Sequence, residues 1–171
     1  IFIFISEFLG LDEELDELGV FDALINKDSH FFVNLLRLKH AQTPEFANSY
    51  KNVNYFFYEI MLLLDNSHQK GDKLYRTALS KFHFSEVNGI NLGFSESSAG
   101  SGFGAKLSKQ VINDAFDIVK SGSKQPEIFQ LVGLFEENVA ADRLSDMIAT
   151  LILSDIKKYP CMYLIDYFRR Y

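Results

Sequence analysis

The clearest pattern of hydrophobic and polar positions follows Thr43-Pro44-Glu45, where apolar residues recur at helical spacing. The apolar positions are Phe46, Tyr50, Val53, Phe57, Ile60 or Met61, and Leu64. Polar residues fall between them, so the segment predicts an amphipathic helix with one buried face. Thr43 suits the N-cap, Pro44 the first helical position and Glu45 the positive end of the helix dipole. We expect this helix to end at Asp65-Asn66-Ser67.

Weaker versions of the same pattern predict helices along most of the chain. They cover residues 11–25 with an interruption at Gly19, 28 or 29 to about 40, 72 to about 82, 105–120, 126 to about 135, 142 to about 159, and a last one from Pro160. Residues 1–5 are all β-branched or aromatic, and they form either an edge strand or the end of a buried element. The sequence therefore predicts an all-α fold, an irregular bundle of about seven helices.

The sequence also predicts which residues share one side of the helix that begins near residue 28. Asp28 and Ser29 are both good N-cap residues, so the first turn should follow them. From that start we expect one side of the helix to present Phe32, Leu35, Leu36 and Lys39.

A long loop rich in glycine and serine, residues 88–104, separates two of the predicted helices and holds five of the ten glycines. Free backbone amides at the start of the following helix favour an anion, and a lysine in its first turn adds positive charge. The anion-binding candidates are Gly100, Ser101, Gly102, Gly104 and Lys106. The loop does not match a Walker phosphate loop, because Ala105 and Leu107 stand where that motif needs Gly and Ser or Thr. The alternative is a surface loop or a hinge without a ligand.

A second candidate site is the acidic elbow, which we define as Glu136, Glu137, Asp142, Arg143 and Asp146. Asp142 and Asp146 share a helix face, and the two glutamates lie at the carboxyl end of the preceding helix, where they oppose its dipole. Four carboxylates in such a bend would hold Mg²⁺ or Mn²⁺ and activate water for phosphoester cleavage. The alternative is structural, with Asp142 as an N-cap and Arg143 paired with a glutamate.

Composition restricts the class of protein. The chain has 171 residues, 47% of them hydrophobic, which is enough for one domain, and its 17 Phe and absent Trp predict a core rich in phenylalanine. Residues 1–26 carry seven of the 23 acids and no Lys or Arg, so they form an acidic amino-terminal arm in a chain of net charge −6. The sequence shows no stripe of basic residues of the kind that binds phosphates, and this disfavours nucleic acid as a partner.

Other features point to an intracellular, cytoplasmic protein without membrane segments. The lone Cys161 cannot form an internal disulfide, and no apolar run approaches the ~18 residues of a membrane span. The apolar start at Ile1 lacks the basic flank of a signal peptide. Because the chain begins with Ile rather than Met, we expect it to be a fragment of a longer protein. The four histidines are scattered and show no metal-binding spacing.

Several stretches carry a family resemblance: LGVFDALINKDSHFF, FHFSEVNGINLGFS and, above all, GSGFG followed by PEIFQLVGLFEENVAADRLSDM. Over most of its length the chain resembles an uncharacterised family of larger bacterial proteins, similar in setting to phage-defence or restriction-associated genes. The resemblance implies no catalytic residues. In the relatives we expect glycine and another small residue where this chain has Val139-Ala140-Ala141, so the elbow would be less tightly turned here.

The sequence leaves two classes of function open. The first is a helical interaction or regulatory domain that binds a protein partner or the remainder of its own chain, with the loop and the acidic elbow on one face. The second is a metal-dependent nuclease or phosphohydrolase. In that enzyme the metal ligands of Mg²⁺ or Mn²⁺ would be Glu136, Glu137, Asp142 and Asp146. The catalytic group would consist of Glu137, Asp142, Arg143 and Asp146, and the loop with Lys106 would bind a phosphate.

Overall fold

The computed structural model describes residues 3–11, 15, 22–25, 33–84, 105–129 and 141–159, and it describes only the backbone of 141–143. Helices make up the secondary structure of these segments. The elements are α1 (Ile5–Leu9), α2 (Leu35–Lys39), the 3₁₀ turn η2 (Pro44–Phe46), α3 (Ser49–Asn66), α4 (Lys73–Lys81), α5 (Ala105–Lys120) and α7 (Ala141–Leu151). Residues 153–159 are also helical. No β-strand occurs among these described residues, so the all-α prediction is confirmed.

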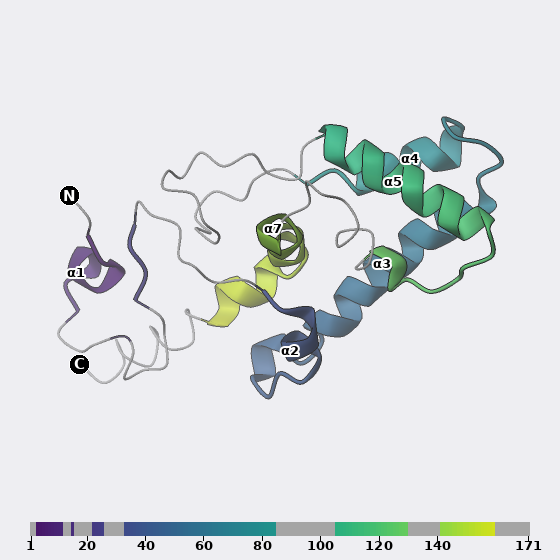
Figure 1. Ribbon diagram of the computed structural model, residues 1–171. Helices are drawn as coiled ribbons and strands as arrows, with labels where there is room; N and C mark the ends of the chain where they lie inside the picture. Colours follow the sequence, from purple (N-terminus) through teal and green to yellow (C-terminus); the bar gives the residue numbers. More distant parts are fainter. Residues whose placement is uncertain are drawn as a thin grey trace.

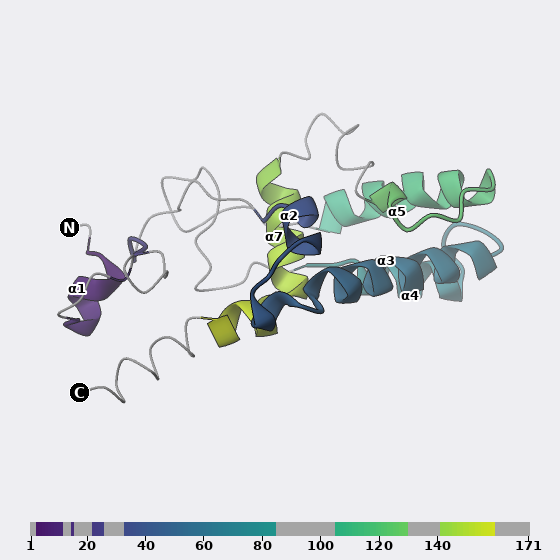
Figure 2. The same ribbon diagram turned by 90° about the horizontal axis from the view of Figure 1, so that it is seen from below.

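The long helix α3 is the centre of the bundle. It packs against α4 and α5 along one end and against α2 and α7 at the other, and Figures 1 and 2 show α4 and α5 lying along it. Its buried face consists of Ser49, Val53, Phe57, Ile60, Met61 and Leu64. Those apolar positions are the ones that the spacing predicts, because a helix with one apolar stripe lowers its free energy by turning that stripe inward.

Helices α4 and α5 begin and end close to where the sequence predicts. The Asp72 carboxylate caps α4 by accepting a hydrogen bond of 2.8 Å from the Tyr75 amide. Helix α5 spans 105–120, as predicted, and stops at Gly122, whose φ of 107° lies in the region that favours glycine. Local capping chemistry therefore determines these boundaries.

Phenylalanine supplies much of the core, as its abundance predicts. Phe57 of α3 stacks on Phe129 with ring centroids 5.4 Å apart, and Phe82 lies 5.6 Å from Phe129. Phe84 meets Phe82 edge-on at 5.4 Å. These rings join α3, the end of α4 and the segment at 128–129, so parts of the chain distant in sequence share one apolar interior.

The start of α3 differs from the prediction. Thr43 makes no side-chain capping bond, Pro44 opens the turn η2, and α3 begins only at Ser49. Two contacts to the helical residues 153–159 accompany this break: the Phe46 ring lies 5.7 Å from the Tyr159 ring, and the buried Ser49 hydroxyl donates to Asp155 at 2.6 Å. The prediction of one continuous helix was wrong because these tertiary contacts orient the first turn separately.

The buried residue of α2 is Leu38, which the sequence pattern did not single out. Asn34 is the N-cap, with its side chain accepting from the amides of Leu36 and Arg37. Within α2 Leu38 is buried, whereas Leu36 is 67% exposed and Lys39 is also exposed. Leu36 and Lys39, which were expected on one side of the helix, are thus both exposed, and α2 turns Leu38 toward the core. The expected caps Asp28 and Ser29 lie outside the described residues.

The last long helix is divided in two. Helix α7 begins at Ala141, one residue before the expected cap Asp142, and ends at Leu151. A turn at Ile152 follows, where the Asp155 amide donates to the Ile152 carbonyl at 2.9 Å, and the chain then resumes as a helix over 153–159. Figures 1 and 2 show that this second helix leaves α7 at an angle. The continuous helix predicted from 142 to about 159 is therefore broken.

The amino-terminal part lies at the opposite end of the molecule from α4 and α5, with α1 set apart in Figures 1 and 2. Phe4 and Leu24 form an isolated antiparallel bridge, and the Ile25 amide donates to the Ile3 carbonyl at 3.0 Å. Residues 22–25 are consequently not helical, contrary to the helix predicted for 11–25, because their backbone pairs with the chain next to α1. Residues 1–5 include this bridge, but the helix α1 already begins at Ile5.

Candidate functional site

Most residues of the two sequence-predicted sites lie outside the described part of the chain. The glycine-rich loop with Gly100, Ser101, Gly102 and Gly104 is one of them, and Glu136 and Glu137 of the acidic elbow are others. Lys106 is described and is exposed in the first turn of α5. The proposed meeting of loop and elbow on one face therefore stays a prediction.

The rest of the acidic elbow falls on α7. Asp142 and Arg143 belong to its first turn, but their side chains are outside the described set, and Asp146 is half-buried one turn later. Among the described residues no group of three or more His, Cys, Asp or Glu is arranged to hold a metal ion. His40, His68 and His83 are exposed, consistent with the scattered spacing of the histidines.

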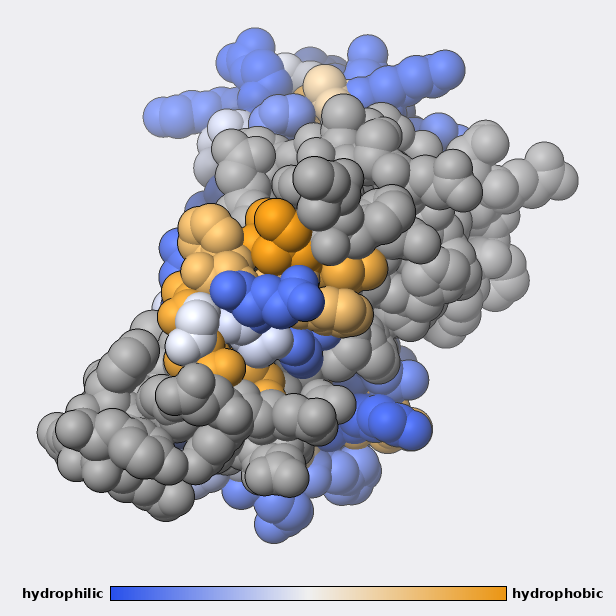
Figure 3. Space-filling model, turned by 90° about the vertical axis from the view of Figure 1, so that its left-hand side faces the viewer, coloured by the Kyte–Doolittle hydropathy of each residue, from blue (hydrophilic) through white to orange (hydrophobic). Residues whose placement is uncertain are grey.

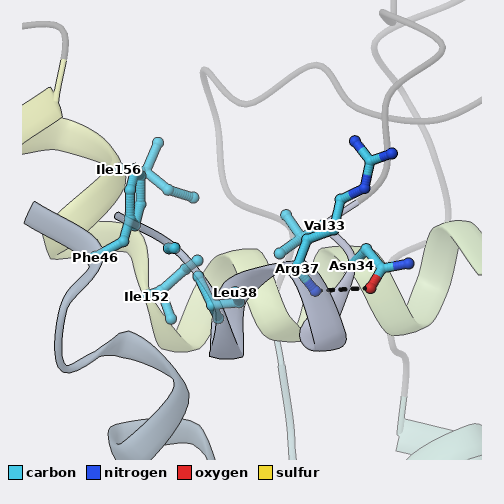
Figure 4. Close-up of a pocket in the computed structure, with 8 residues that line it drawn as sticks. Val33, Asn34, Arg37, Leu38, Phe46, Ile152 and Ile156 are labelled. Atoms are coloured by element: carbon cyan, nitrogen blue, oxygen red, sulfur yellow. Dashed lines mark hydrogen bonds between the residues drawn. The ribbon is translucent and has the colours of Figure 1, made fainter. Parts of the chain in front are cut away.

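The described residues instead form an apolar groove of about 280 Å³ between α2 and the break at Ile152. We call this the α2 groove. Its apolar lining consists of Val33, Leu38, Ala41, Phe46, Ile152 and Ile156, and Asn34 and Arg37 complete it. Figure 4 shows Phe46, Ile152 and Ile156 gathered on one side of the opening and Val33 with Arg37 on the other.

Two buried hydroxyls fix the walls of the α2 groove. Ser145 of α7 accepts a hydrogen bond of 2.7 Å from the Val33 amide and ties the segment before α2 to α7. Ser49 donates to the Asp155 carboxylate, which joins the start of α3 to the helix that carries Ile156. Because both serines are buried, these bonds are protected from water and hold the walls at a set separation.

Arg37 is the charged residue in the described lining of the α2 groove. Arg37 is exposed, its guanidinium points away from the apolar lining in Figure 4, and no acid pairs with it in the described part of the chain. Lys157 and Lys158 follow Ile156 and are exposed. The nearby acids are less available: Asp155 is only 8% exposed and also receives Lys158 at 3.4 Å, and Glu45 is half-buried.

Exposed apolar side chains add to this picture. Leu36 precedes the groove residue Arg37 in the sequence and is 67% exposed. The α1 region contributes exposed Ile3, Phe4, Phe8 and Leu9. Figure 3, which views the molecule from the α1 end, shows a central hydrophobic area crossed by hydrophilic atoms. Helix α3 adds exposed Tyr55, Tyr58 and Leu62, so exposed apolar side chains occur on α1, α2 and α3.

The clearest pKa shifts lie at the other end of the bundle and are structural. Hydrogen bonds from the Tyr75 amide, with those from His68, Ser67 and Gln69, hold the pKa of Asp72 far below its usual value. Burial raises the pKa of Tyr75, whose hydroxyl donates to Asn113 at 2.5 Å. The Tyr75 bond joins α4 to α5, and the Asp72 bonds cap α4, so these shifts report local packing and capping.

Sequence reasoning did not find the α2 groove. Its walls come from residues 33–46 and 152–156, and no periodicity links two segments so far apart. The available signal was the strongly apolar LLRL run of α2, because a five-residue helix cannot turn all its leucines to one core.

Comparison with known proteins gives one match. Residues 10–163 match the model of a family described as a domain of unknown function, DUF8370. No curated protein and no solved structure matches the chain. No helix in the described segments combines the length and hydropathy of a membrane span.

Proposed function

We propose that this chain, which belongs to the DUF8370 family of unknown function, is a helical protein-interaction domain whose partner docks in the α2 groove. The observation that carries the proposal is the apolar lining of the groove beside Arg37, a cation that meets no acid among the described residues. Protein interfaces commonly combine an apolar centre with a polar or charged rim.

The groove suits a side chain of a partner better than a separate small molecule. Its volume of about 280 Å³ lies just below the ~300–1,000 Å³ of ordinary ligand pockets. Hydrogen-bonding groups that would orient a small ligand are scarce, because Asn34 already caps α2 with its side chain. A bulky apolar anchor needs only the fit that the groove provides.

The test is site-specific photocrosslinking in the cells that produce the protein. A benzoylphenylalanine at exposed position 36 of α2 is next in the sequence to the lining residue Arg37, and the same residue at exposed position 80 of α4 is the control. We expect a discrete crosslinked protein from position 36 that is absent from position 80. The crosslink should disappear when Ala41→Trp fills the groove and persist with Ala47→Trp, since Ala47 is exposed outside it.

The crosslinking result has a clear contrary outcome. If Ala41→Trp retains the thermal unfolding temperature of the wild type and the same protein is still captured from position 36, the partner does not use the groove. Absence of any crosslink from position 36 in the folded protein likewise overturns the proposal.

The enzyme alternative makes a separable prediction. A metal site in the acidic elbow requires that Mn²⁺ or Mg²⁺ raises the unfolding temperature of the wild type and not of the Asp142→Ala/Asp146→Ala variant, because an ion bound by the folded state stabilises it. The interaction function expects no such difference at millimolar metal. This measurement therefore distinguishes the two classes.

The proposal includes the setting implied by the family resemblance: a regulatory part of a larger bacterial protein, working in the cytoplasm in phage defence or restriction. Support comes from the resemblance of the segments around GSGFG and PEIFQLVGLFEENVAADRLSDM alone. Its test is genomic. Genes next to the one that encodes this chain should encode nucleases, methyltransferases or other defence enzymes, and a random neighbourhood across relatives contradicts it.

A further inference from the structure

We infer that two copies of this chain associate through the exposed side of α3, with the two α3 helices antiparallel about a two-fold axis at Tyr58. The surface concerned, which we call the α3 strip, consists of Lys51, Tyr55, Tyr58, Leu62 and Asp65. The strip lies on the side of α3 away from its buried face, and none of its residues lines the α2 groove. This surface is therefore separate from the one that the proposed function uses.

The spacing of the α3 strip places its members along one line of the helix. Lys51, Tyr58 and Asp65 follow one another at intervals of seven residues, and Tyr55 and Leu62 fall between them at the same interval. Seven residues make almost two full turns, so side chains with this spacing share one face. From Lys51 to Asp65 the strip runs about 21 Å, at the helical rise of ~1.5 Å per residue.

The centre of the α3 strip is apolar and exposed. Tyr55 is 63% exposed, Tyr58 44% and Leu62 39%. Helix α3 turns its other side toward α4 and α5, so these three large side chains remain in water. Tyrosine is enriched at protein interfaces, because its ring buries a large apolar area at a low cost in side-chain entropy. The centre of the strip is thus suited to pack against a second apolar surface.

Opposite charges at the two ends of the α3 strip identify the occupant as a second copy. Lys51 is exposed at one end and makes no ion pair within the described part of the chain. Asp65 stands at the other end, and its carboxylate meets the exposed Lys124 at 3.3 Å while its side chain stays 33% exposed. Both lie seven residues from Tyr58, so a second strip turned end for end sets each Lys51 against an Asp65. The surface is therefore complementary in charge to its own reversed copy.

The same charges select antiparallel over parallel pairing. A parallel pair would place Lys51 beside Lys51 and Asp65 beside Asp65, and like charges at an interface are unfavourable. In the antiparallel pair Tyr58 lies beside Tyr58 on the axis, and Tyr55 lies close to Leu62 of the second copy. Each of the other contacts then occurs twice, as two-fold symmetry requires.

The experiment measures the association of the full chain by sedimentation equilibrium. A contact between two single helix faces is smaller than the ~1,600 Å² of a standard interface, so we expect a dimer with a Kd on the order of 10–100 μM. A concentration range from about 1 to about 500 μM covers this Kd. At the lowest concentration the chain is monomeric, and unfolding temperatures measured there report whether each variant is folded.

Exchange of the two charges tests the contact between Lys51 and Asp65. Lys51→Glu and Asp65→Lys should each raise the dimer Kd at least about fivefold, because each sets like charges against one another at both ends of the strip. An equimolar mixture of the two variants should dimerise like the wild type, since a carboxylate at 51 then faces an ammonium at 65 and the native pair remains at the other end. The matched controls are Lys73→Glu on exposed α4 and Asp117→Lys, which breaks a comparable ion pair on α5, and both should leave the Kd within about twofold.

Cysteine pairing determines the orientation of the two helices. In a Cys161→Ser background, Tyr58→Cys should form a disulfide-linked dimer on oxidation with copper phenanthroline, because position 58 lies at the two-fold axis. Lys51→Cys should not, because the two copies of position 51 stand about 21 Å apart in the antiparallel pair. A disulfide from Lys51→Cys without one from Tyr58→Cys would indicate parallel pairing and contradicts the inference.

The remaining outcomes also decide the matter. A wild-type chain that stays monomeric to about 500 μM overturns the inference, because that concentration exceeds the expected Kd. Equal weakening by Lys51→Glu and Lys73→Glu would reflect net charge alone and contradicts it. A dimer lost in Ala41→Trp and unchanged in Lys51→Glu assigns the association to the α2 groove instead. The crosslink from position 36 tests the α2 groove separately, so either surface can fail while the other stands.

Discussion

Asp72 shows how one side chain determines a local structure. Its carboxylate accepts from the amides of Tyr75 and His68 and from the Ser67 hydroxyl, at 2.8, 2.7 and 2.9 Å. These donors favour the charged form, so the pKa of Asp72 is lowered from 3.8. An N-cap aspartate before an amphipathic run is readable from sequence, and here the expected start of α4 was confirmed.

Acid titration tests this assignment. Because the folded-state pKa of Asp72 is below the unfolded one, its stabilisation is complete above about pH 5 and is lost as pH falls through 4 and lower. We expect Asp72→Ala to lower the unfolding temperature by roughly 2–4 °C at pH 7. The difference from wild type should shrink steadily toward pH 2. A difference that stays constant with pH contradicts the role of the charge; Lys73→Ala is the neighbouring control.

Tyr75 provides the alkaline counterpart. Burial raises its pKa above 10.0, so the folded state binds the phenolic proton more tightly than the unfolded state. The corresponding stability is present below pH 10 and is lost as pH rises beyond it. We expect Tyr75→Phe to lower the free energy of unfolding by about 1 kcal/mol at pH 7, because it removes the hydrogen bond to Asn113. Above pH 10 the free energy of unfolding should fall less steeply with pH in this variant than in the wild type. Urea unfolding at both pH values checks this; Tyr55→Phe, on an exposed ring, should change neither.

The boundaries of elements depend on residues with special backbone geometry. Gly122 ends α5 with a φ of 107°, and no atom lies within 4 Å of the place where a Cβ would stand. The cost of Gly122→Ala is therefore backbone strain alone. We expect a loss of about 1 kcal/mol in the free energy of unfolding, measured with urea. Lys124→Ala, which removes an exposed ion pair with Asp65, should cost less than about 0.5 kcal/mol. Equal effects of the two changes contradict this reading.

Other elements show why sequence patterns failed in particular places. The periodicity of Phe46 to Leu64 was correct, yet it did not reveal that the helix breaks before Ser49. The break coincides with the Ser49 to Asp155 hydrogen bond, which joins residues 106 positions apart. Likewise Ile152 fits the apolar stripe of α7 although the chain turns there. Apolar spacing reports which side is buried, and it does not report whether the axis bends.

At the scale of the whole molecule, one aromatic interior unites the bundle. Phe57 is fully buried and contacts the rings of Phe129 and Phe56. We expect Phe57→Ala to lower the free energy of unfolding by about 3–5 kcal/mol. Tyr58→Ala, one position along α3 on a side chain 44% exposed, should cost less than about 0.5 kcal/mol. Chemical denaturation followed by circular dichroism measures both, and similar losses would contradict a core centred on Phe57.

The sequence by itself determined the helical class, the inward stripe of α3, the bounds of α5 and the phenylalanine core. The helical class, the stripe and the bounds of α5 follow from spacing and capping, which act between a few neighbouring residues. The phenylalanine core follows from the overall composition. Only the tertiary structure decided that Leu36 is exposed, that the chain turns at Ile152 and that these two regions enclose a groove. The physical reason is that burial and bending there depend on contacts such as Ser145 to Val33, whose partners meet only after the chain has folded.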